Sequence, residues 1–330
     1  MARNLIVTLA ALLMAVGARA QDRSPRIDVE SYLIRAEINP RTQSLSATAE
    51  VHFVPLDDNI TAPVFELNNA LTVARVTDGK GRDVQFSRSN QDFTIRVNLP
   101  ETLPKGAPAT LTFTYDGRFT GHEESPVYGI KFAAIQSDHA FLLYSSRWFP
   151  INGYTSDRYT AEYVVTVPSE FRVIGSGNET KAAGEADKTA YTFRYTQPSF
   201  PGSIALVKGE PARVSSQGCT SLLYFRGANS AMTAPYGEEV GKVMAFLTDL
   251  YGLPPQRDLV VVETDNDAPN GYSAPGILFL SSKGIGQRPN VRLITNQVAR
   301  QWWGTLVSPV TRNHIWISNG LARYSEILYV

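Results

Sequence analysis

The sequence predicts an α+β protein in which an antiparallel β domain precedes a mixed α/β domain. Residues 26–215 contain many short runs in which apolar and polar residues alternate, and this period of two is typical of half-buried strands. Beyond residue 230 the apolar residues recur at helical spacing. A length of 330 residues favours two domains over one. We therefore expect a β domain in residues 21–215 and an α/β domain in residues 216–330.

The first twenty residues have the pattern of an export signal. Arg3 precedes a short apolar run in residues 5–16, and Ala18 and Ala20 are small residues placed before a cleavage point. The run is too short to span a bilayer comfortably. We predict that residues 1–20 are a signal peptide, that the mature protein is secreted (periplasmic or extracellular), and that it has no transmembrane segment after cleavage.

The clearest strand pattern lies in residues 45–53, where apolar and polar side chains alternate over nine positions. Because many short strands separated by turns are typical of layered sheets, we predict an antiparallel sandwich or saddle. The same period recurs in residues 32–38, 93–99, 110–115, 159–167 and 191–196.

The second domain begins with a predicted helix over residues 235–251, which Gly252 ends. We predict buried strands in residues 258–263 and 277–280, then a helix containing residues 293–303 and another that begins near Ser318.

The composition argues against a nucleic-acid partner. Lys and Arg number 31 and Asp and Glu also number 31, whereas proteins that bind nucleic acid favour basic surfaces. Cys219 is the sole cysteine, so no intrachain disulfide can form, and we expect it to be a small core residue.

Three motifs near the C-terminus occur in a recognisable order. Residues 296–300 read N-Q-V-A-R, residues 301–309 read Q-W-W-G-T-L-V-S-P, and residues 316–324 read W-I-S-N-G-L-A-R-Y. This order resembles the aminopeptidase N family of zinc metallopeptidases (gluzincins), which carries H-E-x-x-H, then H-Q-W-F-G-N-L-V-T-P, then W-L-N-E-G-F-A-x-Y. Residues 147–150 (R-W-F-P) and 251–255 (Y-G-L-P-P) are similar to upstream family segments.

The resemblance implies a β saddle followed by a thermolysin-like catalytic-type domain. In the family, further helix and a Tyr that stabilises the reaction intermediate follow the last zinc ligand, whereas this sequence ends at Val330. We therefore expect the second domain to be truncated, either because the sequence is a fragment or because the protein is naturally shorter. The apolar residues 327–330 would then need cover, either from lost downstream sequence or from a partner chain.

The family's zinc chemistry is not retained at the matching positions. The two His positions are Asn296 and Arg300, the general-base position is Gln297, and the third-ligand position is Asn319. A neutral amide is a poor zinc ligand, a guanidinium repels the ion, and a glutamine cannot act as a base. We expect no bound zinc, no other cofactor and no catalytic residue at these positions.

The family's substrate loop corresponds to Gly271, Tyr272, Ser273 and Ala274, and Ser273 replaces the Glu that would bind a peptide amine. Arg300 would instead place a positive charge in the old cleft, paired with Glu326 or bound to an anion. We predict a secreted, catalytically inactive binding or assembly module that takes a peptide or a small anionic ligand. An active metallopeptidase of the same family and a hydrolase with unrelated chemistry remain alternatives.

Other polar and aromatic residues have less specific interpretations. Ser273 lies in a near match to a nucleophile elbow, but that motif needs a following helix, and a strand is predicted there. The histidines lack metal-ligand spacing, and only His314 is expected near the cleft. Core packing is the favoured interpretation of the paired tryptophans. The residues concerned are His52, His122, His139, His314, Trp302 and Trp303.

Overall fold

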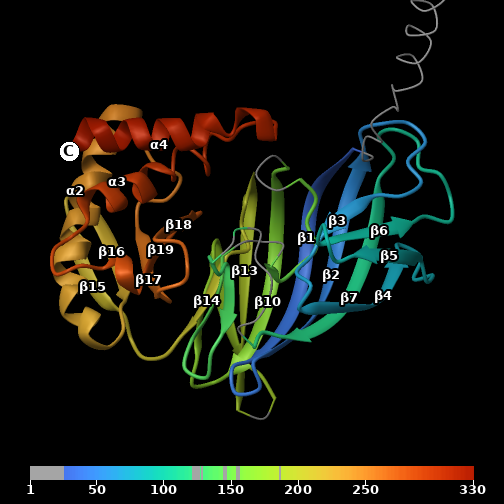
Figure 1. Ribbon diagram of the computed structural model, residues 1–330, viewed down its shortest axis with the longest axis horizontal. Coiled ribbons are helices and arrows are strands. Elements are labelled where there is room, and N and C mark those ends of the chain that lie inside the picture. Colours follow the sequence, from blue (N-terminus) through green and yellow to red (C-terminus); the bar gives the residue numbers. More distant parts are fainter. Residues whose placement is uncertain (1–25, 121–126, 128, 144–146, 154–156, 186) are drawn as a thin grey trace, which may run out of the picture.

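The computed structural model describes residues 26–330 except 121–126, 128, 144–146, 154–156 and 186. The predicted signal peptide and His122 lie outside the described residues. The N-terminal half is built from strands, and its largest sheet has the order β12-β13-β10-β1-β2-β7-β4 (Figure 1). These strands are β1 (Ile27–Asn39), β2 (Ser44–Pro55), β4 (Leu71–Asp78), β7 (Ala109–Arg118), β10 (Tyr159–Pro168), β12 (Asn178–Ala183) and β13 (Lys188–Ser199).

Two smaller sheets pack on this one, and the three together enclose one apolar core. One has the order β3-β6-β5 and the other β11-β14-β9-β8. Their strands are β3 (Val64–Glu66), β5 (Gln85–Ser89), β6 (Thr94–Asn98), β8 (Ala133–Ile135), β9 (Ala140–Leu142), β11 (Arg172–Ile174) and β14 (Ile204–Val207).

The alternation of apolar and polar residues in β2 buries one face of the strand, as predicted. Its apolar residues from Leu45 to Phe53 are buried and the polar residues between them are at least partly exposed, because successive side chains of a strand point to opposite faces. The expectation of a purely antiparallel sheet is wrong at one seam, where β1 pairs with β10 in parallel. A parallel pair needs a long connection, and more than a hundred residues separate these two strands.

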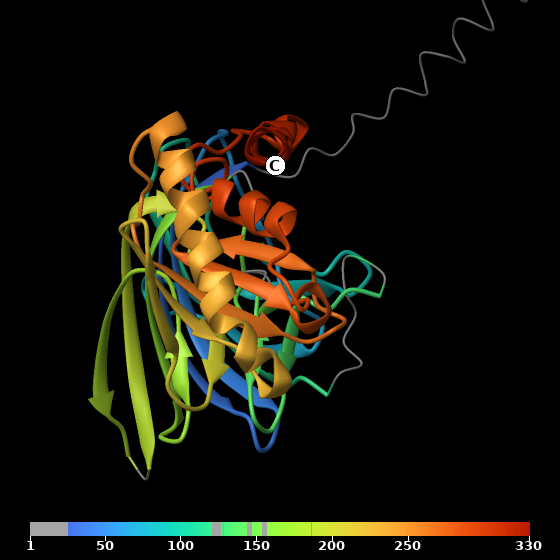
Figure 2. The same cartoon turned by 90° about the vertical axis from the view of Figure 1, so that its left-hand side faces the viewer.

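The C-terminal half is a five-stranded sheet with the order β15-β16-β17-β19-β18. The helix α2 (Thr233–Tyr251) packs on β15 and β16, and α3 (Val291–Ala299) lies beside α2 (Figure 2). The sheet takes in residues 212–215, so it begins slightly before the expected boundary at 216. Its strands are β15 (Ala212–Ser216), β16 (Cys219–Tyr224), β17 (Leu259–Thr264), β18 (Gly271–Ala274) and β19 (Ile277–Ser281).

The helix ends near the predicted site differ from those expected. The side chain of Asn290 accepts a hydrogen bond from the Leu293 N–H at 3.2 Å and caps α3. This helix ends at Ala299 rather than continuing to residue 303. The next residues form turns that include Gly304. The φ of Gly304 is 148°, a backbone conformation that favours glycine. The last helix, α4 (Trp316–Tyr329), begins two residues before Ser318.

The two halves of the chain share a second apolar core. Phe141 and Ala205 from the N-terminal half pack in one cluster with Val262 and Phe279 of the C-terminal sheet. That sheet therefore has helices on one face and N-terminal strands on the other (Figure 1).

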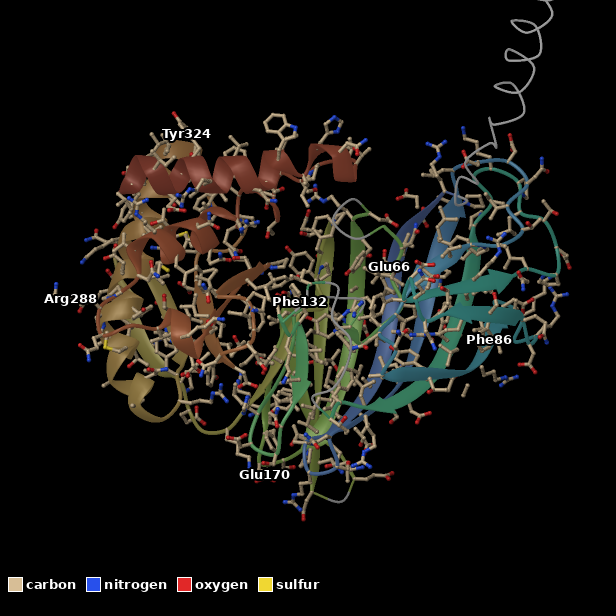
Figure 3. The ribbon with its side chains drawn as sticks, in the orientation of Figure 1. Glu66, Phe86, Phe132, Glu170, Arg288 and Tyr324 are labelled. Carbon is tan, nitrogen blue, oxygen red and sulfur yellow. The ribbon has the colours of Figure 1, made fainter. Side chains whose placement is uncertain are left out.

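The outer face of α4 carries exposed apolar side chains. Trp316, Tyr324 and Ile327 are 63%, 53% and 60% exposed, respectively, and Figure 3 shows Tyr324 pointing away from the molecule. In the part of the chain that the structure describes, no helix combines the length and the apolar character needed to cross a membrane.

Candidate functional site

Residues at the predicted zinc-ligand positions meet between α3 and α4. Asn296 and Arg300 lie one helical turn apart and therefore face the same way, and Asn319 lies in the first turn of α4. The Nε of Arg300 donates to Asn296 Oδ1 at 3.2 Å, and its Nη2 donates to Asn319 Oδ1 at 3.1 Å. A single guanidinium thus links three positions that are up to 23 residues apart in sequence.

Gln297 connects this group to the predicted substrate segment. Its side chain is buried, donates to Asn296 Oδ1 at 3.3 Å and accepts a hydrogen bond from Ser273 Oγ at 3.1 Å. The backbone of β18 approaches so closely that a Cβ at Gly271 would lie 2.8 Å from the Gln297 side chain. The structure therefore places two of the predicted substrate residues, Gly271 and Ser273, directly against Gln297, which lies at the predicted general-base position.

Glu326 is buried beneath the same group. Its carboxylate pairs with Arg323 and lies 3.7 Å from Arg292 Nη1, which offsets the cost of burying its charge. Asn296 Nδ2 also donates to Glu326 Oε2 at 3.4 Å. Asn296 therefore bridges Glu326 and Arg300, the two residues between which the sequence suggested a pairing.

This donor set does not fit a zinc ion. Zinc takes thiolate, imidazole and carboxylate ligands, whereas the converging groups here are two carboxamides and a guanidinium. The carboxamide oxygens already accept hydrogen bonds from a permanent cation. Within the described residues, no group of three or more His, Cys, Asp or Glu side chains is arranged to hold a metal ion.

Beside these residues, β18 forms the end of the five-stranded sheet. It pairs with β19 on one side, and no described strand lies on its other side. An edge of this kind can accept an extended peptide as an added strand. The ring of Tyr272 contacts the rings of Phe132 and Phe279, with centroids 6.5 and 6.2 Å apart, so the strand is braced from both halves of the chain.

The structure also shows the surroundings of several residues to which the sequence assigned no specific role. Ser273 Oγ donates to the Gln297 carbonyl at 2.7 Å, and β19 rather than a helix follows it, so the nucleophile-elbow geometry is absent. Trp302 and Cys219 are buried core residues, and Trp303 contacts Tyr251 with ring centroids 5.0 Å apart. His314 is exposed and lies 3.1 Å from Thr311 Oγ1.

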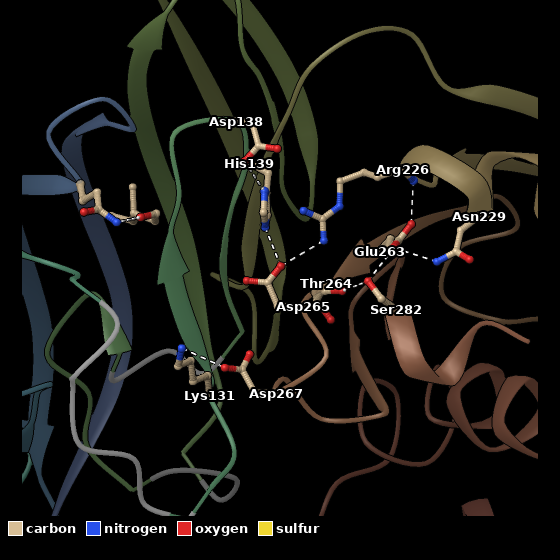
Figure 4. Close-up of polar contacts among 12 residues, drawn as sticks. Lys131, Asp138, His139, Arg226, Asn229, Glu263, Thr264, Asp265, Asp267 and Ser282 are labelled. Carbon is tan, nitrogen blue, oxygen red and sulfur yellow. Dashed lines mark hydrogen bonds and ion pairs between the residues drawn. The ribbon is translucent and has the colours of Figure 1, made fainter.

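Sequence reasoning missed a charged cluster at the carboxyl end of β17 (Figure 4). His139 lies between two carboxylates, with Nδ1 2.8 Å from Asp138 and Nε2 2.7 Å from Asp265. Arg226 Nη2 donates to Asp265 at 3.1 Å. No local motif marks this cluster, because His139 and Asp265 are 126 residues apart.

The cluster fastens the two halves of the chain next to β18. Lys131 makes a second contact, since its Nζ lies 2.8 Å from Asp267 Oδ2 (Figure 4). Burial opposes ionisation of Asp265, but the hydrogen bonds from His139 and Arg226 prevail and lower the pKa of that carboxyl. The segment that leads into β18 is therefore held by ion pairs from the N-terminal half.

Comparison with known proteins finds aminopeptidases among the sequence relatives. No family profile matches the chain. Leucine aminopeptidase 2 of Kluyveromyces lactis is 22% identical over 309 residues, which cover 89% of this chain and 44% of that protein. Human aminopeptidase Q is 26% identical over 100 residues, which cover 26% of this chain and 10% of that protein. The chain thus spans less than half the length of these curated relatives.

Solved structures show the same fold. An M1 zinc metallopeptidase from Deinococcus radiodurans superposes with a TM-score of 0.72 at 20% identity, covering 93% of this chain and 72% of that one. A mutant of that enzyme bound to a Tyr-Ser-Ala substrate superposes with a TM-score of 0.73.

The fold of the described chain is therefore that of the M1 zinc metallopeptidases. Its sequence relatives are aminopeptidases, which confirms the resemblance predicted from the C-terminal motifs.

Proposed function

We propose that this protein is a secreted, non-catalytic relative of the M1 aminopeptidases that acts as a binding or assembly module. In this proposal, the N-terminal sheets correspond to the family's β saddle, and residues from about 216 onward correspond to part of its thermolysin-like domain. The exposed apolar face of α4, around Trp316 and Ile327, would then contact a partner chain or further sequence.

One observation carries the proposal. The Arg300 guanidinium is hydrogen-bonded to Asn296 and Asn319, the two other positions that match the family's zinc ligands. The positively charged side chain of Arg300 thus links α3 and α4 at the positions where relatives would place a metal ion. Since the general-base position is also the neutral Gln297, the matching positions supply neither ligands suited to a zinc ion that would activate a water nor a base to deprotonate that water.

The ligand that best suits this site is a peptide with a carboxylate. The predicted substrate segment has Ser273 where the family carries an acidic residue, and Ser273 is linked through Gln297 and Asn296 to the Arg300 guanidinium. Reversal of the charge reverses the preferred ligand group from an amine to an anion. An extended peptide added along β18 would bring such a carboxylate toward the guanidinium.

Metal analysis of the purified mature protein after exposure to zinc tests the inactive assignment. We expect no stoichiometric zinc and no chelator-sensitive release of N-terminal amino acids. Stoichiometric zinc with chelator-sensitive activity, lost on substitution of Asn296, Gln297, Arg300 or Asn319, would establish a working metallopeptidase instead.

A reconstruction tests the position of the site. The combined changes Asn296→His, Arg300→His and Asn319→Glu should create zinc affinity measurable by titration calorimetry, and Gln297→Glu would add a base. Arg300→His alone is the matched control and should bind no zinc, because two carboxamides remain. A triple variant that folds normally but takes up no zinc would show that these residues do not correspond to the family's ligands.

A further inference from the structure

A polar groove lies at the junction of the two halves, away from the site between α3 and α4. It runs between the end of β13 and two loops of the C-terminal half, residues 255–256 and 305–306, and has a volume of about 600 Å³. Its described lining includes two guanidinium groups and no carboxylate, together with uncharged polar side chains. The polar residues that matter below are Arg158, Arg194, Asn178, Gln197 and Gln256.

Arg158 has no described carboxylate partner. Its Nη2 donates to the Thr305 carbonyl at 3.1 Å and its Nη1 to the Leu306 carbonyl at 3.5 Å, while its buried Nε has no hydrogen-bond partner among the described residues. By contrast, Arg194 pairs with Glu162 at 2.6 Å. A half-buried guanidinium that contacts carbonyls but no described carboxylate favours binding of an anion.

The geometry of the guanidinium suits an oxyanion. Arg carries five N–H donors in a planar fork, and two of them are used by the carbonyls of Thr305 and Leu306. One hydrogen on each terminal nitrogen remains. These remaining donors can bind the oxygens of a carboxylate or a sulfate.

The remaining wall of the groove suits hydroxyl groups. Gln256 lies against Gly276 so closely that a Cβ there would be 1.8 Å from Gln256 Oε1, so the glycine makes the space that the carboxamide occupies. Asn178 and Gln197 contribute exposed carboxamides at the same groove. A carboxamide both donates and accepts hydrogen bonds, as a sugar hydroxyl does.

We infer that this groove binds an acidic sugar, with the carboxylate on Arg158 and the hydroxyls on the carboxamides of Asn178, Gln197 and Gln256. The inference is independent of the site around Arg300, because the two sites share no residue. It also gives Arg158 a role beyond joining the two halves of the chain.

Titration of the mature protein with sodium glucuronate, followed by NMR or calorimetry, tests the inference. Glucuronate should bind saturably with a Kd of about 1 mM or tighter, and glucose and sodium sulfate should each bind more weakly. Arg158→Gln should weaken glucuronate binding roughly tenfold. Arg194→Gln is the matched control and should change it less than about threefold, because Glu162 already neutralises Arg194.

A second variant keeps the test independent of the contacts that Arg158 makes within the protein. Gln256→Ala should weaken glucuronate binding and leave sulfate binding unchanged, because only the sugar presents hydroxyls. No saturable binding of glucuronate at about 50 mM, far above the affinity expected of a specific site, would overturn the inference. Equal affinity of the Arg158→Gln variant and the parent would also overturn it. Equal affinity for sulfate and glucuronate would reduce the groove to an adventitious anion site and overturn the assignment to a sugar.

Discussion

Asp157 should make the protein less stable as the pH rises, and replacing it with Asn should remove this effect. The carboxylate accepts hydrogen bonds from the Val29 N–H at 3.1 and 3.3 Å and from Asn152 Nδ2 at 3.3 Å. Burial is the main cause that raises the pKa of Asp157 from 3.8 to about 8, and the nearby Asp28 raises it further.

The sign of the effect follows from proton linkage. Between pH 3.8 and about 8 the folded state keeps a proton on Asp157 that the unfolded state releases. Unfolding is therefore favoured as the pH rises, with a limiting slope of about 1.4 kcal/mol per pH unit. Water reaches part of this carboxyl and screens it, so we expect about 1–2 kcal/mol in total between pH 5 and pH 8.

Urea unfolding of the parent and of Asp157→Asn at pH 5, 6, 7 and 8 measures this contribution. Asparagine keeps an oxygen for the Val29 N–H but cannot ionise, so the variant should be about as stable as the parent at pH 5 and more stable at pH 8. Asp116→Asn, on the exposed face of β7, is the control and should show no such trend. A difference between Asp157→Asn and the parent that stays constant or reverses with pH would refute the reasoning.

Three further outcomes follow from other parts of the molecule. His139→Gln should destabilise the protein by about 1–3 kcal/mol near pH 7, because it removes a hydrogen-bond partner of Asp265. The loss should shrink below pH 4 as Asp265 is protonated, since the pKa of that carboxyl is lowered in the fold. A loss independent of pH would contradict the contact between His139 and the Asp265 carboxylate. Phe113→Ala, at a fully buried ring that contacts Phe65, should cost about 3–5 kcal/mol in urea unfolding, and a change below about 1 kcal/mol would contradict its place in the core. Mass spectrometry of exported protein should show cleavage after Ala20, and an intact N-terminus would argue against the signal peptide.

The parts of the fold that depend on local patterns could be predicted from the sequence. Alternation identified β2, and helical spacing with Gly252 identified α2, because these patterns reflect which face of a single element is buried. The meeting of Asn296, Arg300 and Asn319 also followed from the sequence, because the motif spacing is that of a known family.

Features that depend on distant partners could not be predicted. Nothing near Ile34 indicates a parallel neighbour at Tyr163, and the contact of His139 with Asp265 depends on how the two halves dock. The early end of α3 at Ala299 was missed because Gln301 and Trp302 are compatible with a helix, and the turns that replace it close on Gly304. Tertiary context decided each of these cases.

The parallel seam between β1 and β10 imposes an order on assembly. Strands β2, β7 and β4 can complete one side of the sheet once residues up to 118 are available. The other edge of β1 stays open until residues 159–168 arrive, and an open edge invites pairing with a second chain. Arg35 and Glu37 are exposed on the outer face of β1. Charged side chains on an unpaired strand oppose its pairing with a second chain. These two residues therefore protect β1 until β10 has been synthesised.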